Sequence, residues 1–167
     1  MPKTESFDIT TGVDLQEVDN AVNQARKELA NRFDFKNVVL EIDYDRTAPK
    51  ISVHTADDFK LESVWQSLSQ RLAARSVPLK NVQRGKIQEA AGGTVRQEFA
   101  ITQSIDSETA RKIVKFLKDQ KLKKIQSAIQ GDTVRISSPS RDELQGVIQM
   151  LKDEDWGMEL KFGNYRQ

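Results

Sequence analysis

The sequence predicts an α+β protein made of two ferredoxin-like domains in tandem, each with the order strand, helix, strand, strand, helix, strand. Two observations lead to this prediction. Residues 125–151 read as a strand, a tight turn, a second strand and a capped helix, which is half of such a domain. A similar succession of patterns occupies the first half of the chain, and 167 residues are enough for two copies.

The first copy begins with a short strand over residues 7–11, followed by a helix that Asp14 caps. Apolar residues then recur every three or four positions, which indicates one buried helix face. This stripe consists of Leu15, Val18, Val22, Ala25 and Leu29. Two strands are predicted over residues 38–44 and 50–54, with a turn between them.

A second helix follows the cap residues 55–58. Its buried stripe consists of Leu61, Val64, Trp65, Leu68 and Leu72. Pro78 lies beyond this helix, and a helix does not readily continue through proline. A strand over residues 81–90, irregular at Gly85, completes the first copy.

The second copy is predicted to have strands over residues 98–105 and 158–165 and a helix capped by Asp106. Gly131 and Asp132 form the short link of a hairpin. Behind it, Ser140 and Glu143 form a capping box. In this motif the serine hydroxyl accepts a hydrogen bond from the backbone N–H three residues on, and the glutamate reaches back to the serine N–H.

The turn at residues 91–94 contains two glycines and is too short for anything but a hairpin. In a ferredoxin-like sheet the last strand lies beside the first strand. We therefore expect the strand that follows this turn to occupy the first-strand place of domain 1. The N-terminal strand would then occupy the first-strand place of domain 2. The predicted domain 1 is residues 13–103, with its first-strand place filled by about residues 95–103. Domain 2 is residues 104–167 plus the N-terminal strand, residues 1–12. The alternative is a hairpin added at an outer sheet edge, without exchange.

Composition narrows the class of protein. The chain has no cysteine and one histidine, so disulfides and thiolate metal sites are excluded and no metal site or cofactor is expected. No window is apolar enough to span a membrane, and the first ten residues lack the apolar segment of a secretory signal. We expect a cytoplasmic protein.

Charge is unevenly distributed along the chain. Residues 1–62 carry 13 acidic and 8 basic side chains, whereas residues 63–135 carry 6 acidic and 14 basic ones. A basic middle segment favours an anionic partner, although a solvated lysine-rich face is the more ordinary interpretation. Catalysis has little support, because the one histidine, His54, lies at the end of a predicted strand where a surface or turn role is more common. No catalytic residue is predicted.

The open face of the second domain's sheet is the better candidate surface. Arg135 projects away from the buried Val134 and Ile136, and Lys161 and Tyr165 are expected to share a face of the last strand. The aromatic pattern of an RNA-recognition sheet is absent. Such a face suits a nucleotide held by phosphate contacts and one stack.

A run of basic residues on and after the predicted helix of the second copy supports an alternative, an RNA-binding module. Its backbone contacts would be Lys115, Lys118, Lys121 and Lys123. Each phosphate neutralised by such a surface adds salt-sensitive affinity.

Several stretches together resemble the YajQ family of bacterial proteins. They are SFDI at residues 6–9, VDLQEVDNAVNQARKE at 13–28, RFDFK at 32–36, IVKFLKDQKLK at 113–123, IQGDTVRI at 129–136, SRDELQGVI at 140–148 and FGNYR at 162–166. They span nearly the whole chain, and the match is weakest over residues 48–91. The tail ends in Tyr165, Arg166 and Gln167, where the family typically has Phe-Arg-Asp.

The resemblance implies two ferredoxin-like domains with exchanged first strands and a cytosolic, non-enzymatic protein. It also implies nucleotide binding, with cyclic di-GMP or RNA as ligands of some members and a transcriptional regulator among the expected partners. It carries over no settled set of ligand residues. From the residues themselves we predict a nucleotide site that consists of Arg135, Arg141, Lys161, Tyr165 and Arg166.

Overall fold

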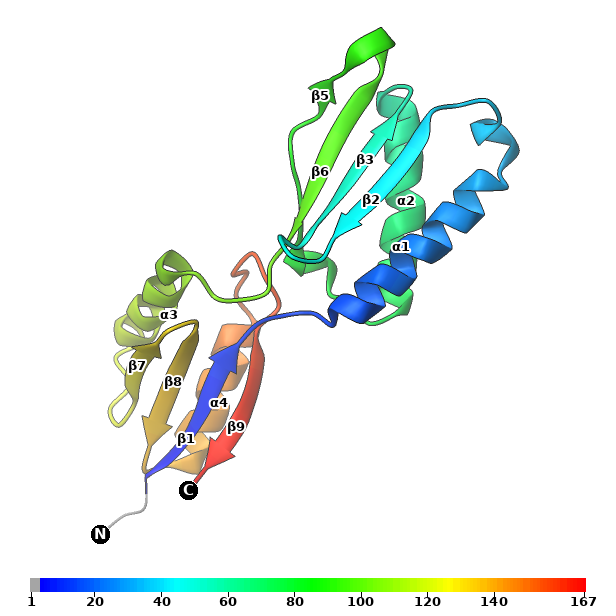
Figure 1. Ribbon diagram of the computed structural model, residues 1–167. Helices are drawn as coiled ribbons and strands as arrows, with labels where there is room; N and C mark the ends of the chain where they lie inside the picture. Colours follow the sequence, from blue (N-terminus) through cyan, green and yellow to red (C-terminus); the bar gives the residue numbers. More distant parts are fainter. Residues whose placement is uncertain (1–3) are drawn as a thin grey trace. The chain divides into compact units, whose positions relative to one another are not determined.

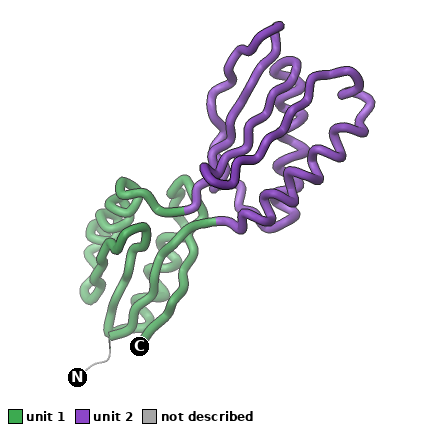
Figure 2. Tube along the Cα trace, viewed as in Figure 1, with its two compact units in different colours: residues 1–12, 104–167 green, residues 13–103 purple. Residues whose placement is uncertain are grey.

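The structure, a computed structural model, describes residues 4–167; residues 1–3, the start of the predicted 1–12 segment, lie outside the described residues. The chain divides into two compact units (Figure 2). Unit 1 contains residues 4–12 and 104–167, and unit 2 contains residues 13–103. Over the described residues the chain forms four α-helices and two antiparallel sheets, so it is an α+β protein.

Unit 2 contains two α-helices and a five-stranded sheet (Figure 1). Its elements are α1 (Leu15–Ala30), η1 (Phe33–Phe35), β2 (Leu40–Asp45), β3 (Lys50–Thr55), α2 (Asp58–Ala74), η2 (Leu79–Asn81), β4 (Val82–Arg84), β5 (Gln88–Glu89), η3 (Ala91–Gly93) and β6 (Val95–Ile101). The strand order is β2-β3-β6-β4, and the short β5 also pairs with β6.

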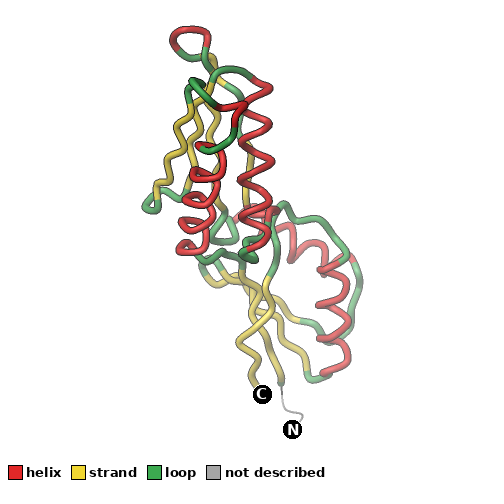
Figure 3. The backbone as a smooth tube through the Cα atoms, turned by 90° about the vertical axis from the view of Figure 1, so that its right-hand side faces the viewer, coloured by secondary structure: helices red, strands yellow, loops and turns green. Residues whose placement is uncertain are grey.

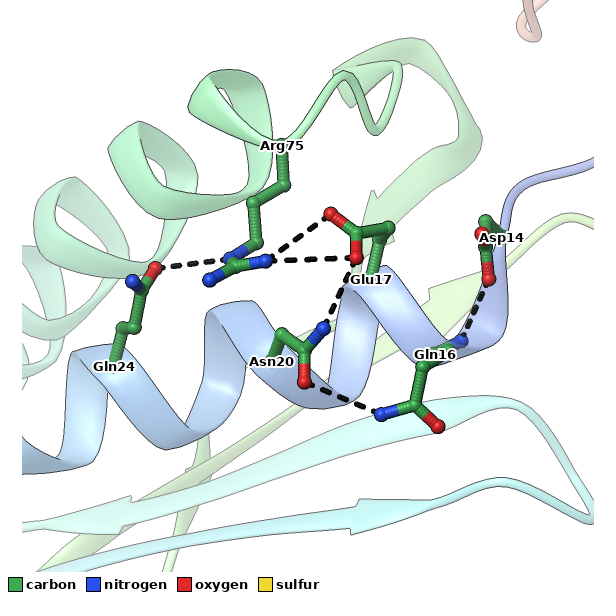
Figure 4. A network of polar contacts seen from close by, with 6 residues as sticks. All are labelled: Asp14, Gln16, Glu17, Asn20, Gln24 and Arg75. Atoms are coloured by element: carbon green, nitrogen blue, oxygen red, sulfur yellow. Dashed lines mark hydrogen bonds and ion pairs between the residues drawn. The ribbon is translucent and has the colours of Figure 1, made fainter.

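Both helices of unit 2 begin at aspartate caps. The Asp14 carboxylate accepts a hydrogen bond from the backbone N–H of Gln16, and Asp57 accepts one from that of Lys60. A polar network joins the start of α1 to the end of α2 (Figure 4). In it Arg75 contacts Glu17 at 3.2 Å and donates to Gln24 at 3.0 Å.

The core of unit 2 lies between its helices and one sheet face. The sheet contributes Ile42, Ile51, Val53 and Phe99, all buried. Phe99 stacks on Trp65 of α2 with ring centroids 5.2 Å apart. Strand residues alternate between faces, so the charged residues of β2 and β6 lie on the opposite, open face.

Unit 1 has two helices and a four-stranded sheet in the order β7-β8-β1-β9. Its elements are β1 (Glu5–Thr10), α3 (Ser107–Asp119), β7 (Gln126–Gln130), β8 (Thr133–Ser138), α4 (Arg141–Lys152) and β9 (Lys161–Arg166). Both helices lie on the same side of the strands (Figure 3). Phe7, Ile9, Val134 and Ile136 point toward them and are buried.

The central strands of the two sheets come from distant parts of the chain. The N-terminal β1 lies between β8 and β9 in unit 1, and Phe7 pairs with Ile136. In unit 2, β6 lies between β3 and β4, with Ile51 opposite Phe99.

Several strand limits differ from those expected. The strand expected over residues 98–105 is β6, Val95–Ile101, because pairing begins as soon as the turn at residues 91–93 ends. The strand expected over residues 81–90 is interrupted between β4 and β5 around Gly85, where an added Cβ would lie 2.8 Å from the carbonyl oxygen of Glu98. The last strand begins at Lys161 rather than at residue 158, after Gly157 adopts a positive φ of 76°.

The predicted capping box at α4 is only half formed. Ser140 caps the helix and accepts from the backbone N–H of Glu143 at 3.4 Å. The N–H of Ser140 instead donates to the hydroxyl of Ser138 at 3.0 Å, so the glutamate does not make the reciprocal bond.

Candidate functional site

A buried carboxylate lies on the open face of the unit 1 sheet. Asp8 follows Phe7 in β1 and therefore points away from the helices; it is only 7% exposed. Arg135 of β8 donates to one carboxylate oxygen at 3.0 Å, and Asn164 and Arg166 of β9 donate to the other, each at 2.7 Å. Three hydrogen bonds from both neighbouring strands thus converge on Asp8.

These contacts keep Asp8 ionised. Burial alone would raise the pKa of the Asp8 carboxyl, but hydrogen bonds from Arg135 and Asn164 and the charge of Arg166 outweigh it, and the pKa is lowered. In return, the carboxylate fixes the two guanidinium groups on either side of β1. Their side chains are 30% and 40% exposed. A guanidinium has five N–H donors, so each retains donors for an anion.

A second carboxylate of β1 has partners on the other sheet face. Glu5 alternates with Phe7 and so points to the helix side. The hydroxyl of Tyr165 donates to Glu5 at 2.5 Å, and Arg141, at the start of α4, lies 3.4 Å from it. The Tyr165 hydrogen bond and Arg141 lower the pKa of Glu5. The hydrogen bond to Glu5 raises the pKa of Tyr165, and the contacts with Tyr165 and Glu5 raise the pKa of Arg141.

The five residues of the predicted nucleotide site therefore fall into separate places. Arg135 and Arg166 meet at Asp8 on the open face, and Lys161, opposite Thr10, lies on that face as well. Tyr165 and Arg141 meet at Glu5 on the helix side. The expectation that Lys161 and Tyr165 share a face is wrong, because an irregularity in β9 shifts the register between Asp8 and Ser6.

Asn164 lies within this irregularity, and its φ of 55° places its backbone in the left-handed region. On β1, Ser6 pairs with Arg166 and Asp8 with Gly163, so β9 has one extra residue between these pairs. The bulge turns the Tyr165 side chain to the helix side and leaves Arg166 on the open face.

A pocket of about 360 Å³ adjoins the open face at the end of β8 where Ser137 pairs with Ser6. Its lining is polar hydroxyl and amide groups, a lysine and two apolar residues: Thr4, Lys124, Ile125, Gln126, Ser137, Ser138 and Pro139. Ser137 is two residues from Arg135 on β8, so the pocket and the arginines belong to one end of the same surface. This volume is at the small end of the range for ligand pockets.

The four lysines of the RNA alternative are exposed. Lys115 and Lys118 lie on α3, and Lys121 and Lys123 lie in the loop before β7. Over residues 4–167 none of the four has a carboxylate within 4.0 Å, unlike Lys112, which pairs with Glu108. The structure therefore leaves these four charges available to solvent and anions.

Asp8, Glu5 and Asn164 were not among the predicted site residues. Asp8 and Glu5 were detectable, because alternation along β1 places Glu5 on the face of Phe7 and Asp8 on the opposite face, and the expected neighbouring strand carries Arg135. Asn164 had no signal, since its role depends on the bulge.

No group of three or more histidine, cysteine or acidic side chains suited to a metal ion occurs within the part of the chain that the structure describes. His54, the one histidine, lies 2.8 Å from the hydroxyl of Thr94 and 3.4 Å from Glu41. Among residues 4–167, no helix is long and apolar enough to cross a membrane.

The fold and the site define a small α+β protein with two arginines fixed on an open sheet face. The family described as "Nucleotide-binding protein YajQ-like" matches residues 5–166, and the chain belongs to this family. The resemblance carried by the sequence motifs is thereby confirmed.

Relatives match over nearly their full length. The chain is 48% identical over 161 residues to a nucleotide-binding protein of Koribacter versatilis, covering 96% of both chains. It is 45% identical over 166 residues to a nucleotide-binding protein of Alkaliphilus oremlandii, covering 99% of this chain and all of the relative. A nucleotide-binding protein of Desulfitobacterium hafniense is 46% identical with the same coverage.

Proposed function

We propose that this protein binds a nucleotide on the open face of the unit 1 sheet, without a catalytic step, and that Arg135 and Arg166 hold its phosphates. The observation that carries the proposal is the buried Asp8, which fixes both guanidinium groups and leaves each of them N–H donors. The relatives named above are called nucleotide-binding proteins, which agrees with it.

Lys161 and the neighbouring pocket complete the proposed site. Lys161 lies on the same face and adds a third cation. The pocket offers the Gln126 amide and the Ser137 hydroxyl to the edge of a base. In this arrangement Arg141 and Tyr165 hold β1 through Glu5 and do not touch the ligand.

The ligand we propose is a cyclic dinucleotide such as cyclic di-GMP. Arg135 and Arg166 lie on the strands that flank β1, so their backbones are two strand spacings, roughly 10 Å, apart. Their guanidinium groups meet at Asp8, and two cations side by side suit a ligand with two phosphates better than a ligand with one. We further propose that the bound form signals to a protein partner, such as a transcriptional regulator, in the cytoplasm.

The test compares two arginine variants with the same chemical change. Arg135→Gln removes a proposed ligand contact, whereas Arg141→Gln removes an equivalent ion pair on the other sheet face. Titration calorimetry with cyclic di-GMP and GMP should show a loss of about tenfold or more in cyclic di-GMP affinity for Arg135→Gln and little change for Arg141→Gln. Unchanged affinity in a folded Arg135→Gln protein would overturn the site.

A second candidate function rests on a separate observation, the four unpaired lysines around α3. If RNA is the ligand, Lys115, Lys118, Lys121 and Lys123 neutralise its phosphates. The logarithm of the affinity for a single strand should then fall with the logarithm of salt concentration with a slope of about −3 for four contacts. Replacing Lys118 and Lys123 with glutamine should reduce this slope by roughly half. A slope near zero excludes this function.

We also propose that each unit is a ferredoxin-like βαββαβ domain and that the two have exchanged their first strands. Three facts support this. The boundaries of the units fall between residues 12 and 13 and between 103 and 104, β1 lies between β8 and β9, and β6 lies between β3 and β4. In each unit two helices pack on one sheet face.

A further inference from the structure

Strand β2 is a regular edge strand of the unit 2 sheet. It ends the order β2-β3-β6-β4, and all six of its residues pair with β3 in unbroken register from Leu40 to Asp45. An edge strand presents backbone N–H and C=O groups that another chain can bind, and proteins usually protect such edges with bulges, charges or shortness.

Two other sheet edges over residues 4–167 carry such protection. Strand β9 has the bulge at Asn164, and β4 has only three residues. Strand β7 (Gln126–Gln130) pairs with β8 in unbroken register and carries no charged side chain, so it offers no basic or acidic row. Strand β2 is neither bulged nor short, and its row of acidic side chains sets the charge of any segment that pairs with it.

One hydrogen bond identifies the groups that point outward from β2. The Nε–H of Arg26 in α1 donates to the carbonyl oxygen of Ile42 at 2.7 Å, so this carbonyl does not point to β3. In an antiparallel pair, outward groups recur at every second residue. The backbone groups of Leu40 and Tyr44 therefore point outward as well, and within the described chain no other backbone partner occupies them.

The β2 edge has a row of acidic side chains and a pocket beside it. Glu41, Asp43 and Asp45 project from the open face, and Asp43 has no cationic partner within 4.0 Å among the described residues. A pocket of about 360 Å³ beside the edge is lined by Arg26, Ala30, Leu40, Glu41, Ile42 and Asp43. A strand added here would place alternate side chains against acids and against this pocket.

We propose that the β2 edge binds an extended segment of a partner protein in which basic residues alternate with small apolar ones. The backbone of the segment would continue the sheet at Leu40, Ile42 and Tyr44. Its basic side chains would lie beside Glu41 and Asp43, and its apolar ones would enter the pocket at Ala30. Arg26 would release Ile42 as the segment binds.

Charge argues against a second copy of this chain as the occupant through the same edge. Antiparallel pairing of β2 with β2 places the acidic row of one copy directly beside that of the other, and like charges opposite one another are destabilising. The acidic row therefore disfavours self-pairing and favours a basic partner.

The test uses the full chain and a synthetic peptide of about seven residues that alternates lysine and valine. Fluorescence anisotropy gives the affinity, and amide exchange followed by NMR gives the location. Peptide should protect the amides of Leu40, Ile42 and Tyr44, whereas those of Glu41 and Asp43 are already bonded to β3 and should change little. Protection elsewhere and not at these three amides would overturn the proposal.

Two acid-to-lysine variants distinguish peptide binding at the β2 edge from attraction by the overall charge of the open sheet face. Asp43→Lys should weaken peptide binding by about tenfold. Glu98→Lys changes the charge equally on the same open face but on β6, two strands away, and should weaken binding by no more than about twofold.

A final comparison separates pairing from charge attraction. A peptide of the same charge, N-methylated on the residues that face β2, cannot donate to the edge and should not bind measurably. Equal binding of both peptides refutes strand addition. Self-association of the free chain with protection of the same three amides, measured by sedimentation, would refute the partner in favour of a second copy.

Discussion

Replacing Asp8 with asparagine should lower the free energy of unfolding of unit 1 by about 2–3 kcal/mol. Asparagine has the same size, and its carbonyl oxygen can still accept from Arg135. Its NH2 group, however, takes the place of the oxygen that accepts from Asn164 and Arg166, each at 2.7 Å. The donor groups of Asn164 and Arg166 then face this NH2 group, which is itself a donor, so two of the three hydrogen bonds are lost.

The magnitude follows from these two bonds. Hydrogen bonds to a charged group contribute about 1.5–3 kcal/mol each. The side chain of Arg166 is 40% exposed and regains water in the variant, so its share is reduced to about 1 kcal/mol or less. The lost hydrogen bond from Asn164 accounts for the rest of the decrease in the free energy of unfolding. The surface variant Asp43→Asn, which loses no such contact, should stay within about 0.5 kcal/mol of the parent chain.

Urea unfolding as a function of pH gives a second check. The pKa of Asp8 is lowered in the folded protein, so its charge adds stability above the unfolded-state pKa. This stability disappears as the pH falls through the folded-state pKa. The difference between the parent and Asp8→Asn should therefore be constant near neutral pH and shrink in acid, where protonated Asp8 resembles asparagine. A difference below about 0.5 kcal/mol at neutral pH, or one that persists unchanged in acid, refutes the reasoning.

Three further substitutions test the packing and the second carboxylate. Gly85→Ala should cost about 2 kcal/mol in urea unfolding, because its Cβ would lie 2.8 Å from the carbonyl oxygen of Glu98. Ser140→Ala removes the α4 cap and should cost about 1 kcal/mol in the same assay. Tyr165→Phe removes the main cause of the lowered pKa of Glu5, so an NMR titration should show that pKa rise toward its ordinary value.

Local signals predicted the ends of the helices well. Asp14, Asp106 and Ser140 are N-caps in the structure as expected, because capping depends on a side chain and an N–H two or three residues away. The hairpin at Gly131 is also confirmed, and its φ of 63° suits glycine. Each of these features depends on residues that lie only a few positions apart in the sequence.

The contacts that decide the site are long-range and were not predicted. Asp8 is 127 residues from Arg135 and 158 from Arg166, so neither pair has a sequence signature. Period-two alternation placed Tyr165 beside Lys161, and a single left-handed residue, Asn164, overturned that assignment. Sequence alone therefore predicted Arg135 and Arg166 as candidates but not the carboxylate that joins them.

The candidate site depends on β1 being paired within the unit 1 sheet. Both acids of this strand bind residues from the C-terminal third of the chain, Asp8 on the open face and Glu5 on the helix face. Without β1 in the sheet, Arg135 and Arg166 would lose the carboxylate that fixes them, and a flexible arginine must lose more rotamer freedom when it binds a phosphate. The N-terminal strand thus completes the sheet and also orients the two guanidinium groups. The strand that carries Asp8 and Glu5 is therefore also the one that continues into unit 2 through residues 11–14.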